Sequence, residues 1–473
     1  MTIARELNRL LAGVLVIFML IALSAAYWAI IGPDTILRRE DNPRLVVAEA
    51  AIRRGSIVDR KGETLAASIV SPDNQVTRHY PHPEASSVIG YSSLRYGVGG
   101  AEAAFNATLR GDDLPADTPD KILADLLHRP QVGSSIQLTL DIGVQQAMME
   151  AMNGQTGAAV VLSVPNGEVL GLLSLPTYDP NTLDLEWDAL AAAPQKPFFN
   201  RVLQGQYQPG GTLQTPLMAA ALVANQSLTE LTPDATVPVQ IDDLTVSCAL
   251  RLPVMELSLR DAYAFACPLP FENLAQQLGV QAVTGALELL HLNEPPTLEG
   301  YTVQPPPAPP IQLQEDTLRK AVLGQGEMTV TPLQMAVMAA AVVNDGNAPE
   351  PYVLMATRPP DAENWKQIQQ ARPTVPYMTE RTARQLQDLM RNTVVNGAAL
   401  NAARPGIDIG GHSALAYSGT EIQSWFIGFA TLPGGRGVAA AVVLENSDDP
   451  GLAADIGGAI LSVAHQSLNQ NGS

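Results

Sequence analysis

Residues 207–222 read YQPGGTLQTPLMAAAL, and the predicted organisation of the whole chain starts from this stretch. Pro-Gly-Gly breaks the chain, Thr212 is of a type that caps helices, and helix-forming residues follow from Leu213 with apolar side chains at helical spacing. The stretch therefore predicts a turn that leads into a buried helix. A helix N-terminus stabilises negative charge and offers free N–H groups, so a serine acyltransferase places its nucleophile at such a turn.

The stretch nevertheless lacks the side chains that acyl transfer requires. The nucleophile would stand in the turn, and its base would follow three residues later on the same face of the helix. Gly211 and Gln214 occupy these two positions, and they supply neither a hydroxyl nor a proton acceptor. Thr212 is adjacent, but successive helical residues point about 100° apart, so we expect it to cap the helix.

The turn resembles the PGSTFKP segment that contains the start of the SxxK motif in class B penicillin-binding proteins. Other stretches resemble further segments of this family: the RGxIxDRNGxxLA segment, the GYxS..YGxxGLE segment, the GAVVALDPxTGEILAMVSxPxxDPN hairpin, and the GQG..VTPLQMA helix. In the same order, these are residues 53–68, 90–111, 157–181 and 324–346.

The resemblance implies an α+β fold with a penicillin-binding-protein transpeptidase domain, similar to a serine β-lactamase, in which helices flank an antiparallel sheet. It assigns this transpeptidase-like domain to residues 136–473 and a pedestal, or dimerisation-type, domain to residues 32–135. The residue pattern agrees, since strand-like runs lie at both ends of the first range with helical patterns between them. These runs are 157–175, with an Asn-Gly turn, and 407–416, 424–431 and 437–445. The residue pattern also predicts a strand–turn–strand at 53–68, a half-buried strand at 136–141, a short exposed Pro-rich linker at 305–310 and an amphipathic helix at 380–396.

The second family motif, SxN, is also altered. LRDAYAFACPLPFENLAQQLG, residues 259–279, aligns with LxxAxxxSCNxAFxxLAxxLG, so Ala266 stands at the serine and Pro268 at the asparagine. Cys267 lies between them, but no base is evident that would make it a thiolate nucleophile, and we expect a packed small residue. The two cysteines, Cys248 and Cys267, either pair in an oxidising compartment or remain two buried thiols.

The third family motif, KTG, has no cation in this chain. Residues 405–430, PGIDIGGHSALAYSGTEIQSWFIGFA, align with PGVxVAGKTGTAE...HAWFxGFA, so that His412 replaces lysine, Ser413 threonine and Ala414 glycine. A second register, with residues 417–420 on KTGT, leaves too few residues before the Trp-Phe pair. Histidine is mostly neutral at pH 7, and we expect an exposed or hydrogen-bonded strand histidine at this position.

The N-terminal region predicts a membrane anchor. The chain is uncharged from Leu10 to Ile31, which is long enough to cross a hydrocarbon core of about 30 Å. Tyr27 and Trp28 resemble an interfacial aromatic anchor more than a signal-peptide cleavage site, so an uncleaved signal anchor over residues 10–31 is favoured over a cleaved signal. The family resemblance implies a short cytoplasmic tail, residues 1–9, with the bulk of the chain outside the cytoplasm.

Composition narrows the range of ligands. The net charge is −19, from 47 acidic and 28 basic residues, which argues against nucleic acid as a partner because phosphate binding requires clustered Lys and Arg. The six histidines and two cysteines lack metal-ligand spacing, and no nucleotide-binding glycine pattern is present. We expect neither a metal nor a cofactor.

These observations favour a catalytically silent homologue that serves as a scaffold or regulator in peptidoglycan synthesis. The resemblance implies a multispan peptidoglycan glycosyltransferase and other elongation or division proteins as partners. Two alternatives remain: an active D,D-transpeptidase that uses non-standard residues, and a sensor that binds a peptidoglycan stem peptide without acylation.

Overall fold

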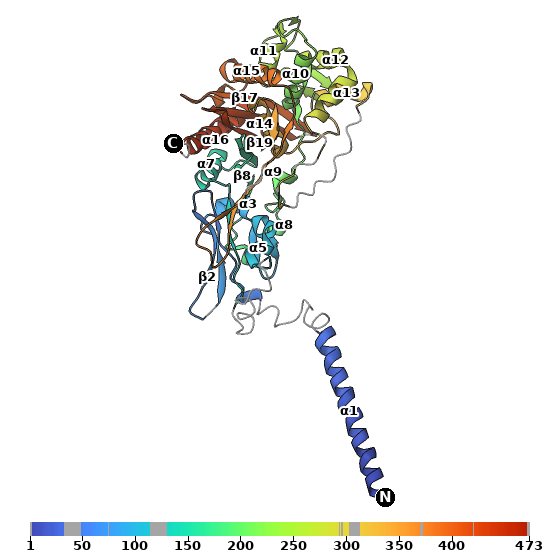
Figure 1. Cartoon of the computed structure of the whole chain (residues 1–473). Coiled ribbons are helices and arrows are strands. Elements are labelled where there is room, and N and C mark those ends of the chain that lie inside the picture. The colour runs from blue at the N-terminus through green and yellow to red at the C-terminus, as the bar shows by residue number, and fades with distance from the viewer. Residues whose placement is uncertain are drawn as a thin grey trace.

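A long N-terminal helix, α1 (Thr2–Gly32), extends away from a two-part body in the computed structural model (Figure 1). The structure describes residues 2–32, 49–73, 75–113, 130–292, 294, 297–301, 313–368, 372–419 and 421–470. Within α1, the residues from Arg9 to Tyr27 have a mean hydropathy of 2.5 and none of them is buried. The predicted apolar helix is therefore present, with the length and composition of a membrane span.

The part of the body nearer to α1 contains a six-stranded sheet in the order β15-β14-β6-β1-β2-β3. The predicted strand–turn–strand at residues 53–68 forms β1 and β2, and the strand predicted from Ile136 forms β6. Two strands of the sheet come from beyond residue 350, so this sheet combines segments from both sides of the predicted domain boundary. Its strands are β1 (Ile57–Val58), β2 (Thr64–Val70), β3 (Val76–His79), β6 (Ser135–Leu138), β14 (Leu354–Arg358) and β15 (Lys366–Gln367).

The distal part of the body is built on an antiparallel five-stranded sheet in the order β17-β18-β19-β7-β8. All the strand-like runs predicted near the two ends of the domain pair within it, which confirms a sheet assembled from distant segments. The strands are β7 (Gly157–Val164), β8 (Val169–Leu175), β17 (Ile409–Ser418), β18 (Glu421–Leu432) and β19 (Arg436–Glu445).

Helices cover both faces of this sheet. On one face, α7 (Ile142–Met152) and α16 (Pro450–Gln470) pack in a core that includes Phe426 and Val442. On the other, α14 (Pro332–Val343) packs in a larger core that includes Trp425 and Ile427. Alternate residues of the same strands thus enter two cores, as the two-residue period of a strand requires.

Several further helices lie around the β17 end of the sheet (Figure 1). The amphipathic helix predicted from Glu380 is α15 (Glu380–Asn396), and it packs against β17. The motif-bearing segments form α10 (Gln214–Val223), α11 (Leu259–Ala264) and α12 (Pro268–Leu289). The Pro-rich linker predicted at 305–310 lies outside the described residues.

Candidate active site

The first motif forms a tight turn beneath β17. A short 3-10 helix, η3 (Gly210–Leu213), leads directly into α10. Gly210 has φ +52°, and a Cβ at this position would lie 2.2 Å from the carbonyl oxygen of Leu415 in β17. Its N–H also donates to the carbonyl of Gly324, at 3.2 Å. Glycine is therefore required for the backbone to pass this close to the strand.

The predicted capping role of Thr212 is wrong. The helical turn begins at Gly210, so Thr212 lies inside it, and the Thr212 hydroxyl donates to the carbonyl of Pro209 at 2.6 Å. The N-cap residue of α10 is Leu213, whose side chain makes no capping hydrogen bond. Thr212 is fully buried, and this hydrogen bond holds its Oγ1 against the backbone of the same turn.

The three altered motifs meet around Gly211. A Cβ built at Gly211 would lie 2.8 Å from the Cβ of Ala414, 3.7 Å from the Cβ of Ala266 and 3.8 Å from Nε2 of Gln214. Real Cβ atoms do not approach other carbons to 2.8 Å, so the methyl group of Ala414 occupies space that a residue-211 side chain would need. The structure thus brings these motif positions together, and the methyl group of Ala414 occupies the space where they meet.

Gln214 faces this cluster from α10 and is 3 % exposed. Its Nε2 donates to the carbonyl oxygen of Cys267, at 3.3 Å. Its Oε1 is buried without a hydrogen-bond partner among the residues that the structure describes. The amide at the base position is therefore a structural link between the first and second motifs, and it has no protonatable group.

The second motif sits in a sharp helix end. After α11, the N–H of Ala266 donates to the backbone carbonyl of Tyr263 and that of Cys267 to the backbone carbonyl of Ala262, the paired bonds of a Schellman motif. Ala266 occupies the left-handed position of that motif, with φ +51°. Alanine there costs about 1 kcal/mol relative to glycine. Pro268 then begins α12 and is buried, so neither motif position offers a hydrogen-bonding side chain.

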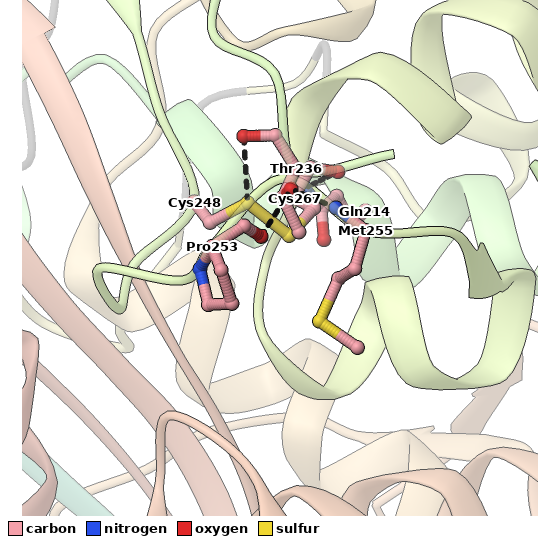
Figure 2. Close-up of a disulfide and its surroundings, with 6 residues drawn as sticks. All are labelled: Gln214, Thr236, Cys248, Pro253, Met255 and Cys267. Carbon is pink, nitrogen blue, oxygen red and sulfur yellow. Dashed lines mark hydrogen bonds between the residues drawn. A yellow bond between two sulfur atoms is a disulfide. The ribbon is translucent and has the colours of Figure 1, made fainter. Parts of the chain in front are cut away.

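Cys267 is joined to Cys248 by a disulfide, which decides between the two alternatives left open by the sequence (Figure 2). Cys267 is fully buried, and as a disulfide sulfur it is not a free nucleophile. The bridge ties the second motif to a neighbouring loop, where the Thr236 hydroxyl donates to Pro253 O at 2.8 Å and accepts from Met255 N at 3.1 Å. Figure 2 shows Gln214 directly beside this bridge.

His412 is completely buried, so the exposed alternative predicted for it is wrong and the hydrogen-bonded one is confirmed. Its Nε2 lies 3.1 Å from the carbonyl oxygen of Gly211, and its ring stacks on Tyr263 with centroids 4.3 Å apart. Because a carbonyl only accepts, Nε2 carries the proton and Nδ1 is the acceptor nitrogen of a neutral ring. Burial lowers the pKa of His412 to about 4, against the opposing effect of its bond to Gly211.

The other two positions of the third motif face opposite sides of β17. Ala414 points toward Gly211, whereas the Ser413 hydroxyl donates to the carbonyls of Trp425 and Pro450, at 2.9 and 2.5 Å, on the α16 side. Ala414 pairs with Trp425 in the β17–β18 ladder, while residues 417 and 418 lie at its far end. The geometry therefore supports the register that places His412, Ser413 and Ala414 on KTG.

Tyr263 is a member of this cluster that sequence reasoning missed. It lies three residues before the second motif, is fully buried, and stacks its ring under His412. Its hydroxyl pairs with Thr215 Oγ1 at 3.0 Å, and burial raises its pKa above the ordinary value. The spacing of Tyr263 on α11 indicates only a core residue, so the sequence contained no signal for this contact.

Comparisons with known proteins agree with this architecture. Residues 157–462 match the family model described as penicillin binding protein transpeptidase domain, and residues 54–136 match the penicillin binding protein A dimerisation domain. The chain is 30% identical over 506 residues to the peptidoglycan D,D-transpeptidase PbpA of Mycolicibacterium smegmatis, covering 97% of this chain and 98% of that protein. It is also 30% identical over 495 residues to PbpA of Mycobacterium tuberculosis, covering 98% and 99%.

A solved structure shares the fold. The penicillin G acyl-enzyme complex of penicillin-binding protein A from M. tuberculosis superposes with a TM-score of 0.76 at 28% identity, covering 87% of this chain and 99% of that one. The fold predicted from the sequence is therefore confirmed.

Proposed function

This chain belongs to the class B penicillin-binding proteins, and we propose that it is a non-acylating member that acts in peptidoglycan synthesis by binding other proteins. Its relatives are peptidoglycan D,D-transpeptidases, so its place in the cell wall pathway follows from the family. The proposal concerns the chemistry at its own site, which differs from the family motifs at each position that the reaction needs.

The methyl group of Ala414 is the observation that carries this proposal. It lies 2.8 Å from where the Cβ of a nucleophile at residue 211 would stand, while Gln214 at the base position holds the Cys267 carbonyl. A nucleophile must reach an open cleft beside a base. Here the surrounding side chains are buried against one another, and none of them is an activated hydroxyl or an amine.

The same contacts disfavour the two alternatives. Among the described neighbours, the possible substitute nucleophiles are all engaged: Thr212 is buried and bonded to Pro209, Cys267 is disulfide-bonded, and the Tyr263 hydroxyl pairs with Thr215. Binding of a stem peptide by the motif cluster would require a cation for the terminal carboxylate. His412 is a poor substitute because burial lowers its pKa to about 4 and keeps the ring neutral at physiological pH.

The apolar helix supports a membrane-anchored role. The chain carries a span-length stretch from Arg9 to Tyr27 ahead of its folded body. We place the N-terminus inside the cell and the body outside the cytoplasm, where a disulfide such as Cys248–Cys267 persists. Contacts with a multispan glycosyltransferase and other elongation or division proteins would then run through α1 and the pedestal region.

A fluorescent penicillin tests the absence of acylation. The full-length chain, folded in detergent, is expected to give no covalent band, while M. tuberculosis PbpA treated in parallel gives one. A band that appears only with the folded chain would contradict the proposal.

The partner role is tested separately, by crosslinking and pull-down from membranes with the full chain and with a chain lacking residues 1–31. We expect the shorter chain to lose partner capture. Equal capture by both chains would show that α1 does not contribute to the interface.

A further inference from the structure

A cavity of about 340 Å³ lies between the pedestal region and the transpeptidase-like domain, away from the altered motifs. The short helix α3 (Ser86–Ile89) and the hairpin of β4 (Tyr91–Ser93) and β5 (Gly97–Gly99) contribute one wall. The other wall comes from the segment after β8 and from residues 197–204. Its volume falls within the range of sites that bind small molecules.

The walls of this cavity are fixed by hydrogen bonds that cross between the two regions. Asn200 Nδ2 donates to Ser87 O at 3.1 Å, and the Tyr301 hydroxyl donates to Val88 O at 2.8 Å. Gly90 and Gly99, two lining residues, lie in close backbone contact, because a Cβ at Gly90 would lie 1.9 Å from the carbonyl oxygen of Gly99. Both regions are therefore held in fixed positions around the cavity, which suits a preformed site.

The lining of the cavity consists of uncharged residues, many of them aromatic. None of the described residues that line the cavity is charged, whereas aromatic rings are concentrated among them relative to a chain that is only 5% aromatic. An ionic ligand would lose its hydration without gaining a counter-charge, so the lining selects against anions and cations alike. The aromatic lining residues are Tyr91, Tyr178, Phe198, Phe199 and Tyr301.

Three polar groups remain available to a ligand. The hydroxyls of Tyr91 and Tyr178 and the Nε2 amide of Gln204 have no hydrogen-bond partner within the part of the chain that the structure describes, although Gln204 Oε1 accepts from Asn200 N at 3.1 Å. Burial, with the neighbouring Tyr91 adding, raises the pKa of Tyr178, so its hydroxyl stays a neutral donor. The site thus offers aromatic surface together with neutral hydroxyl and amide groups.

We propose that this interdomain cavity binds an uncharged glycan segment bearing N-acetyl groups. The flat apolar faces of a sugar ring pack against aromatic rings, and its hydroxyl and acetamido groups match the neutral hydroxyl and amide groups of the lining. Because both regions of the body form the walls, a bound glycan would hold the pedestal region against the transpeptidase-like domain. This inference is independent of whether the motif cluster acylates.

Ligand-observed saturation-transfer NMR on the full-length chain in detergent tests the proposal, with N-acetylglucosamine trimer as the probe at millimolar concentration. Saturable binding is expected, with transfer strongest at ring C–H and acetyl methyl protons. The double variant Y91F/Y178F keeps the rings and removes both hydroxyls, so binding should weaken about tenfold, each lost hydrogen bond accounting for about threefold.

Two further variants make the test specific. Q204E keeps the acceptor for Asn200 N but replaces the free donor, and it should weaken binding about as much as loss of one hydroxyl. Y377F removes a hydroxyl from a tyrosine that stacks on His291 in another region, and binding should be unchanged. Absence of saturable transfer, an unchanged affinity in Y91F/Y178F, or tighter binding of a phosphorylated N-acetylglucosamine would each overturn the proposal.

Discussion

The contact between residues 211 and 414 makes a quantitative prediction for the double-mutant cycle of G211S and A414G. A serine Cβ would begin 2.8 Å from the Ala414 Cβ, where carbon contacts favour 3.5–4.0 Å, and overpacking of this kind costs about 1–3 kcal/mol. A414G alone loses a buried methyl group and adds strand flexibility, at about 1.5 kcal/mol together. In the double variant, the glycine at residue 414 removes the steric clash with the serine at residue 211. The serine side chain in turn fills the space that the Ala414 methyl group leaves.

Urea unfolding of the full-length chain in detergent measures the four free energies of the cycle. The double variant should be more stable than the sum of the single changes predicts, by at least about 1 kcal/mol. Ala440 provides the matched control, since it is buried in the core on the opposite face of the sheet. G211S and A440G should therefore be additive. Additivity in the G211S/A414G cycle as well would refute steric filling of the nucleophile position by Ala414.

Three other predictions follow from the same region. Burial holds the folded-state pKa of His412 at about 4, below the unfolded value of 6.5. The contribution of His412 to the free energy of unfolding is therefore complete above pH 6.5 and falls by up to about 3 kcal/mol as the pH drops toward 4. In urea titrations, H412Q should flatten this part of the plot of stability against pH. Replacing Cys248 and Cys267 by alanine opens a loop of sequence separation 19 and should cost about 3 kcal/mol, with no further loss when reductant is added, whereas the unmodified chain should lose stability in reductant. G210A places a Cβ 2.2 Å from a β17 carbonyl and should lower the free energy of unfolding by more than about 3 kcal/mol. G406A, at a glycine with φ +75° and open space around it, should lower it by only about 1 kcal/mol. Equal melting temperatures of the two variants would contradict the close contact between Gly210 and β17.

Local patterns allowed much of the fold to be predicted. The helix from Glu380 to Asn396 has the predicted ends, because its apolar spacing is regular and Thr379 caps it. The hairpin of β7 and β8 was evident from its Asn-Gly turn. The convergence of Gly211, Ala266 and Ala414 came from the family resemblance, since no local pattern places residues so distant in sequence together.

The features that sequence reasoning missed depend on tertiary contacts. His412 is buried with its ring stacked on Tyr263, whereas in the sequence a histidine on an apolar strand is compatible with either exposure or burial. Thr212 fits a capping position by residue type, but the helical turn already begins at Gly210, where the backbone passes close to β17, so Thr212 lies inside the turn. The pairing of two cysteines likewise requires the distance between them, which composition does not contain.

Intact-mass measurement after incubation with penicillin G tests most directly whether the site is chemically silent. M. tuberculosis penicillin-binding protein A, whose penicillin G acyl-enzyme complex is known, serves as the parallel sample. The full-length chain should keep its unmodified mass, while the control protein gains the mass of one penicillin. A stoichiometric adduct on the folded chain, mapped by peptide sequencing to any residue of the cluster around Gly211, would contradict the account.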